Sequence, residues 1–370
     1  MNILMILSNP LMVDPRVHKE AKALVDAGNK VTVIVWDRKG EYDDEGIVDG
    51  IKIIRIYNKG LLKILPKPLL KIPVWWRKAY KKGLALYKNG FDFDVVHCHD
   101  FDTLKVGLWL KKRLGCKLIY DAHEIFGYML KDEHPILSKI VFSIEKKLVR
   151  NVDHIITIDE PFRKHYCSFN KPVTTVMNCK DLMYLDYEPP NNDVFTLIYI
   201  GIMGRSRFFP QIIEIVGGID GVKLILAGKK ELLFDDMREL SKKYENIEFL
   251  GTVPTKDILH LTRNADVTFV LADVKGQHHL NVFNKQFEAM VCGRPIIVTK
   301  GTYAAELTNE LNCGISVDYN EDSVKKAIIQ LRDNPRLCQE LGMNALKAAK
   351  EIYNWDVEKK NLLKVYKEII

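Results

Sequence analysis

The chain of 370 residues alternates short runs of β-forming residues with helical patterns from its N-terminus to about residue 320. This alternation predicts parallel sheets covered by helices on both faces, because each strand must return through a helix to pair with the next. From residue 321 onward the pattern is helical only. We therefore expect an α/β fold. The predicted strands span residues 2–8, 30–36, 51–56, 94–98, 117–121, 153–158, 173–176, 195–200, 222–227, 247–250, 267–271, 295–299 and 314–317.

A polar, proline-bearing segment, Tyr187-Glu-Pro-Pro-Asn-Asn-Asp193, interrupts this alternation near the middle of the chain. A single core rarely grows past roughly 250–300 residues, so two domains are expected. We place the linker at this segment, which predicts domains of residues 1–187 and 193–352. Each should be a doubly wound, Rossmann-like sheet, with the ligand between the two domains at the C-terminal strand edges.

Two helices have clear ends. Asp14 is a predicted N-cap, Pro15 the first helical residue and Gly28 the stop of the first. The second lies in the segment 281–298, where Gly293 ends the helix and Pro295 prevents its continuation.

This second helix separates apolar from polar residues. Its apolar side chains recur at helical spacing, and its polar stripe holds Asn281, Asn284, Lys285 and Glu288. A carboxylate, an amide and an ammonium near a helix N-terminus suit a sugar nucleotide, which offers ribose hydroxyls and a diphosphate. The alternative is an ordinary surface pair of Lys285 and Glu288.

Composition describes a globular protein, with 47% hydrophobic and 28% charged residues. The apolar N-terminus is short and lacks a basic lead-in, so we interpret it as a first strand and not a signal peptide. No apolar run is long enough to span a bilayer. An odd, scattered set of cysteines suits a reducing cytoplasm; they are Cys98, Cys116, Cys167, Cys179, Cys292, Cys313 and Cys338.

The segment 51–91 contains eleven basic residues and no acidic one. Within it, residues 61–82 combine lysines with leucine, isoleucine and tryptophan, the composition of a membrane-surface element. The alternative is a packed helix whose tryptophans enter the core while its lysines stay solvated. Nucleic acid is not expected as a partner, since clustered leucine and isoleucine fit it poorly. The residues predicted for the acceptor and membrane side are Lys63, Lys67, Lys71, Trp75, Trp76, Arg77 and Lys78.

Histidines end two neighbouring predicted strands. His97 and His99 share one strand face, and His123 follows the next strand. A zinc site is not expected, because no matching pair of ligands appears downstream. No metal and no other cofactor are therefore predicted.

Short motifs along nearly the whole chain resemble the GT-B glycosyltransferases, specifically the large retaining group of family 4. Each is weak alone, but their order and spacing rarely arise by accident. They span residues 14–28, 94–100, 120–124, 152–160, 199–201, 224–228, 247–254, 265–267 and 284–295.

The resemblance implies a two-domain enzyme that transfers a sugar from a nucleotide donor, UDP- or GDP-linked, to a hydroxyl acceptor with retention. The second half is then the donor domain, and a C-terminal helix at about 353–370 packs back on the first. Glu288 matches the residue that holds the donor ribose, and Thr252 and Val253 lie in the stretch beside the base. His123 matches a position near the reacting sugar.

Two positions depart from the family pattern. Many relatives carry a glutamate seven residues before Glu288, where this chain has Leu280, so contact with the donor sugar cannot be carried over. A subgroup with Asn-Lys-x-Phe/Tyr-Glu also lacks it. After the strand 197–200 this chain has Gly201, then Arg205 and Arg207, and Arg207 falls where relatives place a diphosphate-binding lysine.

Charge then suggests the mechanism. Arg207, Lys285 and a helix N-terminus would stabilise the departing diphosphate without a metal. In retaining enzymes of this type the phosphate helps to deprotonate the acceptor, so no protein nucleophile is required. The sequence predicts a metal-independent glycosyltransferase in the cytoplasm, peripheral on the inner, anionic membrane face, with a lipid-linked or membrane-borne acceptor. A sugar-nucleotide epimerase of the same shape and a non-catalytic nucleotide-binding protein are the alternatives.

Overall fold

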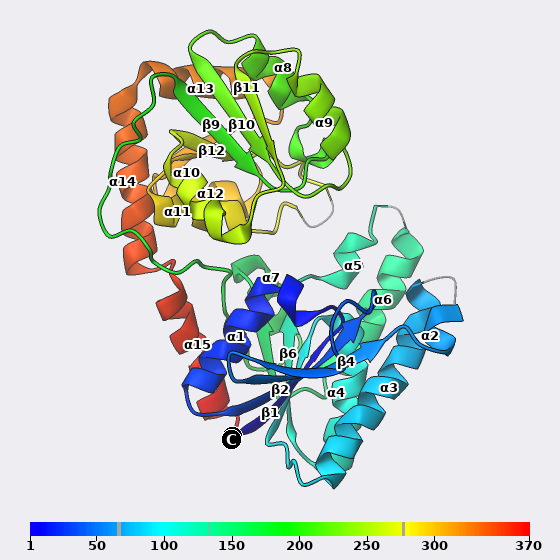
Figure 1. Ribbon diagram of the computed structural model, residues 1–370. Helices are drawn as coiled ribbons and strands as arrows, with labels where there is room; N and C mark the ends of the chain where they lie inside the picture. Colours follow the sequence, from blue (N-terminus) through cyan, green and yellow to red (C-terminus); the bar gives the residue numbers. More distant parts are fainter. Residues whose placement is uncertain (65–67, 133, 276–277) are drawn as a thin grey trace. The chain divides into compact units, whose positions relative to one another are not determined.

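The computed structural model describes residues 1–64, 68–132, 134–275 and 278–370 (Figure 1). It divides into two compact units. Unit 1 contains residues 1–177 and 359–370, and unit 2 contains residues 178–358. The first boundary falls ten residues before the proline-bearing segment at Tyr187, so that segment lies inside unit 2.

Unit 1 is built on an eight-stranded sheet in the order β3-β4-β2-β1-β5-β6-β7-β8 (Figure 1). All pairs are parallel except β3 with β4. The strands are β1 (Asn2–Leu7), β2 (Lys30–Asp37), β3 (Glu45–Val48), β4 (Ile51–Tyr57), β5 (Val95–His99), β6 (Lys117–Ala122), β7 (His154–Thr157) and β8 (Val173–Thr175).

Helices connect these strands, as the alternation predicted. They are η1 (Leu11–Val13), α1 (Pro15–Asp26), α2 (Leu61–Ile64), α3 (Pro68–Lys88), α4 (Phe101–Leu114), α5 (Phe126–Met129), α6 (Pro135–Val149) and α7 (Glu160–Cys167). The ends predicted for α1 are confirmed: the Asp14 carboxylate accepts from the Val17 amide at 3.1 Å, and Gly28 has a positive φ of 84°.

Unit 2 is built on a six-stranded parallel sheet in the order β11-β10-β9-β12-β13-β14. The strands are β9 (Phe195–Ile200), β10 (Val222–Ala227), β11 (Ile247–Gly251), β12 (Val267–Val270), β13 (Ile296–Thr299) and β14 (Gly314–Val317). Its helices are η2 (Arg205–Arg207), α8 (Gln211–Gly217), α9 (Phe234–Ser241), η3 (Thr255–Asp257), α10 (Ile258–Arg263), α11 (Asn284–Cys292), α12 (Tyr303–Glu310), α13 (Glu321–Asp333) and α14 (Pro335–Glu351). The last helix, α15 (Trp355–Glu368), begins in unit 2 and ends in unit 1.

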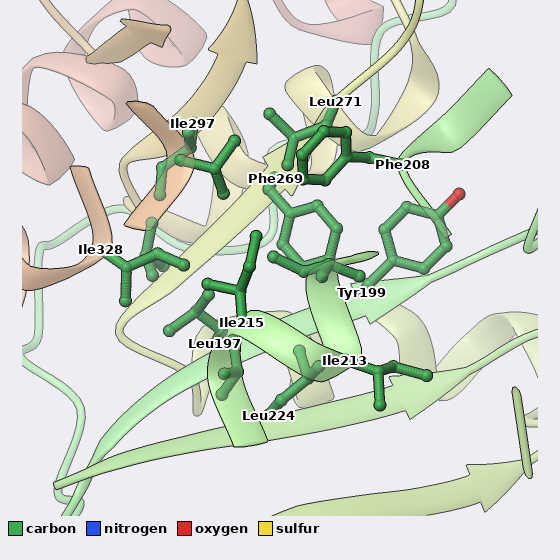
Figure 2. Close-up of a cluster of buried hydrophobic side chains, with 14 of the residues drawn as sticks. Leu197, Tyr199, Phe208, Ile213, Ile215, Leu224, Phe269, Leu271, Ile297 and Ile328 are labelled. Carbon is green, nitrogen blue, oxygen red and sulfur yellow. The ribbon is translucent and has the colours of Figure 1, made fainter. Parts of the chain in front are cut away.

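The core of unit 2 lies beside the central strand β9. Figure 2 shows Leu197 and Tyr199 of this strand among side chains from neighbouring strands and helices, including Phe269 and Ile328. Tyr199 stacks on Phe269 with ring centroids 5.0 Å apart. This packing fixes the ends of β9 and of the strands beside it, where the candidate site is built.

The helix predicted in the segment 281–298 is α11. Gly293 ends it in a left-handed conformation, with φ 64° and ψ 40°, as predicted. Asn281 lies before the helix begins, so it is not part of the helical stripe. All residues of α11 from Gln286 to Cys292 are buried, which excludes an ordinary surface helix.

Candidate functional site

Three strands of unit 2 end beside one another at glycines. The Gly201 amide donates to the Ala227 carbonyl at 2.9 Å, the Gly228 amide to Gly251 at 2.9 Å, and the Thr252 hydroxyl to Gly228 at 2.9 Å. A side chain at Gly228 would overlap the carbonyl of Gly201. This close approach therefore requires glycine at position 228. The same hydrogen bonds bring the predicted residues Gly201 and Thr252 to one edge of the sheet, and Val253 follows Thr252 in the chain.

Lys285 extends from the first turn of α11 across this edge. Its Nζ lies 4.5 Å from the ring centroid of Tyr199, and a side chain at Gly201 would overlap it. Burial lowers the pKa of Lys285 to about 8; Glu288 opposes this shift, while Arg207 and Lys180 add to it. No salt bridge neutralises Lys285 within the described residues.

Arg207 belongs to the short helix η2 and lies near the start of α11. Its guanidinium carbon lies 4.2 Å from the ring centroid of Phe283, the residue that precedes α11. Burial also lowers the pKa of Arg207. Arg205, from the same turn, is exposed, as is Asn284. The structure thus brings Arg207 and Lys285 together over aromatic rings and leaves Arg205 in solvent.

Glu288 lies one turn after Lys285 and is 8% exposed. Its Oε1 forms a salt bridge of 3.0 Å with Nζ of Lys180, which belongs to the segment that opens unit 2. The pair is therefore Lys180 with Glu288, and not Lys285 with Glu288 as a surface pair would require. Sequence reasoning missed Lys180, because it belongs to no motif and its partner lies 108 positions away.

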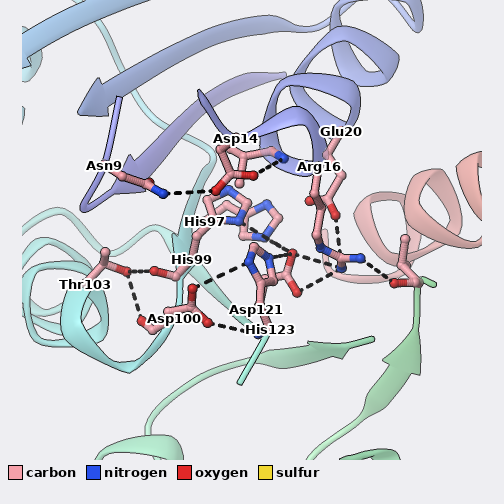
Figure 3. A network of polar contacts seen from close by, with 12 residues as sticks. Asn9, Asp14, Arg16, Glu20, His97, His99, Asp100, Thr103, Asp121 and His123 are labelled. Atoms are coloured by element: carbon pink, nitrogen blue, oxygen red, sulfur yellow. Dashed lines mark hydrogen bonds and ion pairs between the residues drawn. The ribbon is translucent and has the colours of Figure 1, made fainter. Parts of the chain in front are cut away.

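A second polar cluster ends strands β5 and β6 of unit 1 (Figure 3). The His123 ring contacts Asp121 at 3.1 Å through Nε2 and Asp100 at 3.5 Å through Nδ1, and its amide donates to Asp100 at 2.9 Å. Burial opposes a charge on this ring, but attraction to Asp100 and Asp121 outweighs it and raises the pKa of His123 to about 10. The two carboxylates therefore favour the protonated form of His123, although burial raises the pKa of Asp100 itself to about 7.

Arg16 balances the carboxylates behind this histidine. It forms salt bridges of 3.0 Å with Glu20 and 3.2 Å with Asp121, and it donates to the Val176 carbonyl at 2.7 Å. His97 stacks on His99 with ring centroids 4.3 Å apart and contacts the Tyr366 hydroxyl at 2.7 Å. Arg16 and Glu20 belong to the 14–28 motif, where the sequence indicated only a helix. Their contacts with the ends of β5 and β6 become visible only in the folded structure.

Four of these side chains, Glu20, His97, His99 and Asp121, offer ligand atoms within 4.8 Å of one another, a set that could hold a metal ion. The prediction of no metal considered spacing along strands and did not anticipate that α1 places Glu20 beside the histidines. Arg16 already contacts both carboxylates, so a divalent ion would have to share them with a guanidinium.

The tryptophans of α3 do not face outward as a membrane element requires. Trp75 is fully buried and stacks on Trp36 with centroids 5.4 Å apart. The Trp76 indole donates to the carbonyl of Asp102, and its ring packs against Trp109. The prediction of a membrane-facing Trp75 is wrong, because composition does not reveal which helix face meets the sheet.

The basic residues of the same stretch stay at the surface. Lys63 and Arg77 are exposed, while Lys71 and Lys78 are partly buried. Lys67 lies outside the described residues.

Sequence comparison follows the same two-part division. Residues 15–182 match Glycosyltransferase Family 4, and residues 188–348 match Glycosyl transferases group 1. Each half of the chain thus matches a glycosyltransferase domain model. The chain is 25% identical, over 94% of its length and 92% of the relative, to an uncharacterised glycosyltransferase of Methanocaldococcus jannaschii, MJ1607.

Solved structures place this glycosyltransferase in the GT-B fold. Sucrose-phosphate synthase from Thermosynechococcus elongatus has a TM-score of 0.81 at 14% identity, covering 100% of this chain and 99% of that one. Anabaena HepE in complex with UDP-glucose has a TM-score of 0.73 at 14% identity, covering 99% of both chains. The predicted fold and the predicted family are confirmed, and so is glycosyltransferase as the class of enzyme.

Proposed function

We propose that this glycosyltransferase moves a sugar from a nucleoside diphosphate to a hydroxyl acceptor with retention at the anomeric carbon and without a metal. The observation that carries the proposal is the pair of cations in unit 2. Arg207 and Lys285 lie over aromatic rings, without a salt bridge to any described carboxylate. Two such cations form a binding site for an anion, and a diphosphate bound at the start of α11 would be that anion.

The chemistry follows from where charge develops. As the glycosidic bond breaks, negative charge grows on the diphosphate, and Arg207 and Lys285 stabilise it more strongly than they stabilise the bound donor. Glu288 accepts from the ribose hydroxyls. The segment of Thr252 and Val253 lies beside the base.

The raised pKa of His123 favours its protonated form, which suits donation of a hydrogen bond better than general-base catalysis. We assign it a role as a hydrogen-bond donor near the reacting sugar. The acceptor proton then passes to the departing phosphate on the same face of the sugar, which requires no protein nucleophile and gives retention. Arg16 and Asp121 position His123 and keep it charged.

The test is an assay of the purified protein with UDP-glucose, other UDP-sugars and GDP-mannose, with and without EDTA. UDP is the first choice of base, because HepE, a structural neighbour, was solved with UDP-glucose. We expect slow donor hydrolysis that releases the α-sugar, detected by NMR before mutarotation, and no loss of rate in EDTA. Loss of activity in EDTA that manganese restores would overturn the metal-free mechanism. Release of an epimerised sugar nucleotide would favour the epimerase, and tight binding without turnover a non-catalytic protein.

We also propose that the acceptor is presented at an anionic membrane surface on the cytoplasmic side. No helix in the described part of the chain is long and apolar enough to cross a bilayer, so contact would be peripheral. The supporting surface is the outer face of α6, where Ile136, Ile140 and Ile144 are 76%, 49% and 45% exposed. The only acidic side chain of α6, Glu145, is buried, whereas Lys139, Lys146 and Lys147 are exposed. Isoleucines among lysines suit an anionic bilayer.

Co-sedimentation with phosphatidylglycerol vesicles tests this surface. The Ile136→Ser/Ile140→Ser variant should release the protein from the vesicles, while Ile47→Ser should not. Ile47 is a matched control, since it is 75% exposed in the same unit but lies on β3. Equal binding of wild type and the α6 variant would refute a role for α6, and a melting curve of each variant excludes unfolding as the cause of release.

A further inference from the structure

A separate basic cavity of about 790 Å³ lies in unit 1, where strands β2 and β4 end. We call it the basic basin. It is lined by the loops after these strands and by the start of the α2–α3 region. The charged side chains of its lining are Arg38, Lys39, Lys59, Lys63, Lys71, Asp43 and Asp44. In open parallel sheets, ligands bind outside the carboxyl ends of strands, and the basin occupies such a position.

The loop after β2 is held by its own hydrogen bonds. The buried carboxylate of Asp37 accepts from the backbone amides of Lys39, Gly40 and Tyr42 at 3.2, 2.7 and 3.1 Å. The Tyr57 hydroxyl at the end of β4 donates to the Tyr42 carbonyl at 2.7 Å. The two loops that line the basin are therefore fixed to each other.

Arg38 and Lys59 are positioned by the same frame. The Arg38 guanidinium lies 4.4 Å from the ring centroid of the buried Trp36, whose indole donates to Asn58 at 2.9 Å. The Asn58 amide in turn donates to the Arg38 carbonyl at 2.8 Å. Lys59 lies with its Nζ 4.9 Å from the ring of Tyr57.

Four cations of the basin lack a salt bridge in the part of the chain that the structure describes. Arg38, Lys59, Lys63 and Lys71 form no salt bridge with any carboxylate of the described residues. The Asp44 carboxylate faces the Tyr57 hydroxyl. Four cations around one cavity, without a salt bridge to any described carboxylate and two of them held over aromatic rings, outnumber the two carboxylates of its lining and favour a multiply charged anion such as a phosphate.

The basin shares a sheet edge with His123 but is not adjacent to it. The strand order β4-β2-β1-β5-β6 separates the end of β6 from the ends of β2 and β4 by three and four strand spacings. At about 4.8 Å per spacing, this distance is roughly 14–19 Å.

We propose that the basic basin binds a phosphate or diphosphate group of the acceptor, at roughly 14–19 Å from the hydroxyl that receives the sugar. The identity of the ligand as acceptor rests on the proposed function. The geometry selects an acceptor long enough to reach from the basin to His123, such as a short glycan that carries a phosphate at its far end. The group belongs to a soluble sugar phosphate or to a lipid-linked one.

Inorganic pyrophosphate is the probe for the basin. Titrations use protein with Arg207→Ala and Lys285→Met in the background, so that the donor site does not contribute. Adding Lys63→Ala and Lys71→Ala should weaken pyrophosphate binding at least tenfold. Adding Lys146→Ala and Lys147→Ala instead removes two exposed lysines of α6 and should leave binding unchanged. Equal binding in all three proteins, or an equal loss in both lysine pairs, would overturn the proposal.

Two further measurements separate the basin from the proposed function and identify the source of the phosphate. In the otherwise wild-type protein, Lys63→Ala/Lys71→Ala should leave UDP affinity and donor hydrolysis unchanged. If wild type never hydrolyses a sugar nucleotide but still binds pyrophosphate through Lys63 and Lys71, the proposed function fails and the anion site stands. Pyrophosphate that releases the protein from phosphatidylglycerol vesicles supports a lipid-borne phosphate in the basin; vesicle binding indifferent to pyrophosphate supports a soluble phosphate there.

Discussion

The two clusters of charged side chains in this glycosyltransferase differ in how their cations are paired with carboxylates. In unit 1, Arg16 lies between Glu20 and Asp121, and His123 between Asp121 and Asp100, so each cation has carboxylate partners. In unit 2, Arg207 and Lys285 lie over aromatic rings and form no salt bridge with a described carboxylate, although Glu288 attracts Lys285 from a greater distance.

This difference separates what each cluster contributes. A balanced buried network is costly to break, because removing one member leaves the others unpaired. A cation that is removed from water without a partner opposes folding, and this free-energy cost is offset only when an anion binds. We therefore expect changes in unit 1 to appear mainly in stability and changes in unit 2 mainly in ligand affinity.

Removing Arg16 should have the largest effect. Arg16→Met leaves the buried carboxylate of Asp121 without this cation, which should lower the free energy of unfolding by about 3–5 kcal/mol. Glu20 contributes less, because burial raises its pKa to about 8. Urea unfolding of the unliganded protein measures it, with the exposed Arg205→Met as control, expected within about 0.5 kcal/mol of wild type. An Arg16→Met protein as stable as wild type would show that the network is not balanced by this arginine.

Removing Lys285 should have the opposite profile. Lys285→Met deletes a partly buried charge that has no salt bridge within the described residues, so the unliganded protein should be at least as stable as wild type. UDP should bind more weakly by about 1.5–3 kcal/mol, the worth of a hydrogen bond to a charged group. Calorimetric titration measures the UDP affinity, and a melting curve measures the stability of the unliganded protein. A destabilised Lys285→Met protein with intact UDP affinity would reverse the comparison between the two units.

Much of this arrangement was predictable from the sequence, since strands and their ends follow from local pattern. His123 and Arg207 were selected because they match positions of the family that the chain resembles, and Lys285 because it lies on the polar stripe of a predicted helix. Strand β3 was missed: Glu45–Val48 is a short antiparallel edge strand, and neither its length nor its composition distinguishes it from a loop.

What failed depends on contacts between distant parts of the chain. Lys180 contacts Glu288, and Tyr366 contacts His97, although each pair is more than 100 residues apart in the sequence. Local sequence patterns cannot predict such contacts. The membrane prediction for Trp75 failed for the same reason, because a tryptophan among lysines looks alike whether it packs on Trp36 or on lipid.

The pH dependence of UDP binding should reveal the protonation of Lys285, which has no salt bridge among the described residues. Burial lowers the pKa of Lys285 to about 8, so above pH 8 the free enzyme must take up a proton when it binds a diphosphate. UDP affinity should therefore fall by about fivefold from pH 8 to pH 9, because the protonated fraction of Lys285 drops from about one half to about one eleventh over this range. The terminal phosphate, with a pKa near 6, is already ionised and does not contribute. Lys285→Arg should flatten the profile, and a wild-type affinity constant over this range would contradict the assignment.

The smallest expected effect concerns Glu288, whose partner came only from the structure. Lys180 contacts Oε1 of Glu288 and leaves the second oxygen for the ribose. We expect Lys180 to orient the carboxylate and not to compete for it. Glu288→Gln should weaken UDP binding by about 1 kcal/mol, the net worth of an ordinary hydrogen bond, with little change in the melting temperature. Lys180→Met should weaken it less, and the double variant should lose no more than Glu288→Gln alone, because without the carboxylate there is nothing left to orient. Tighter UDP binding by Lys180→Met would instead show that the lysine occupies the ribose position.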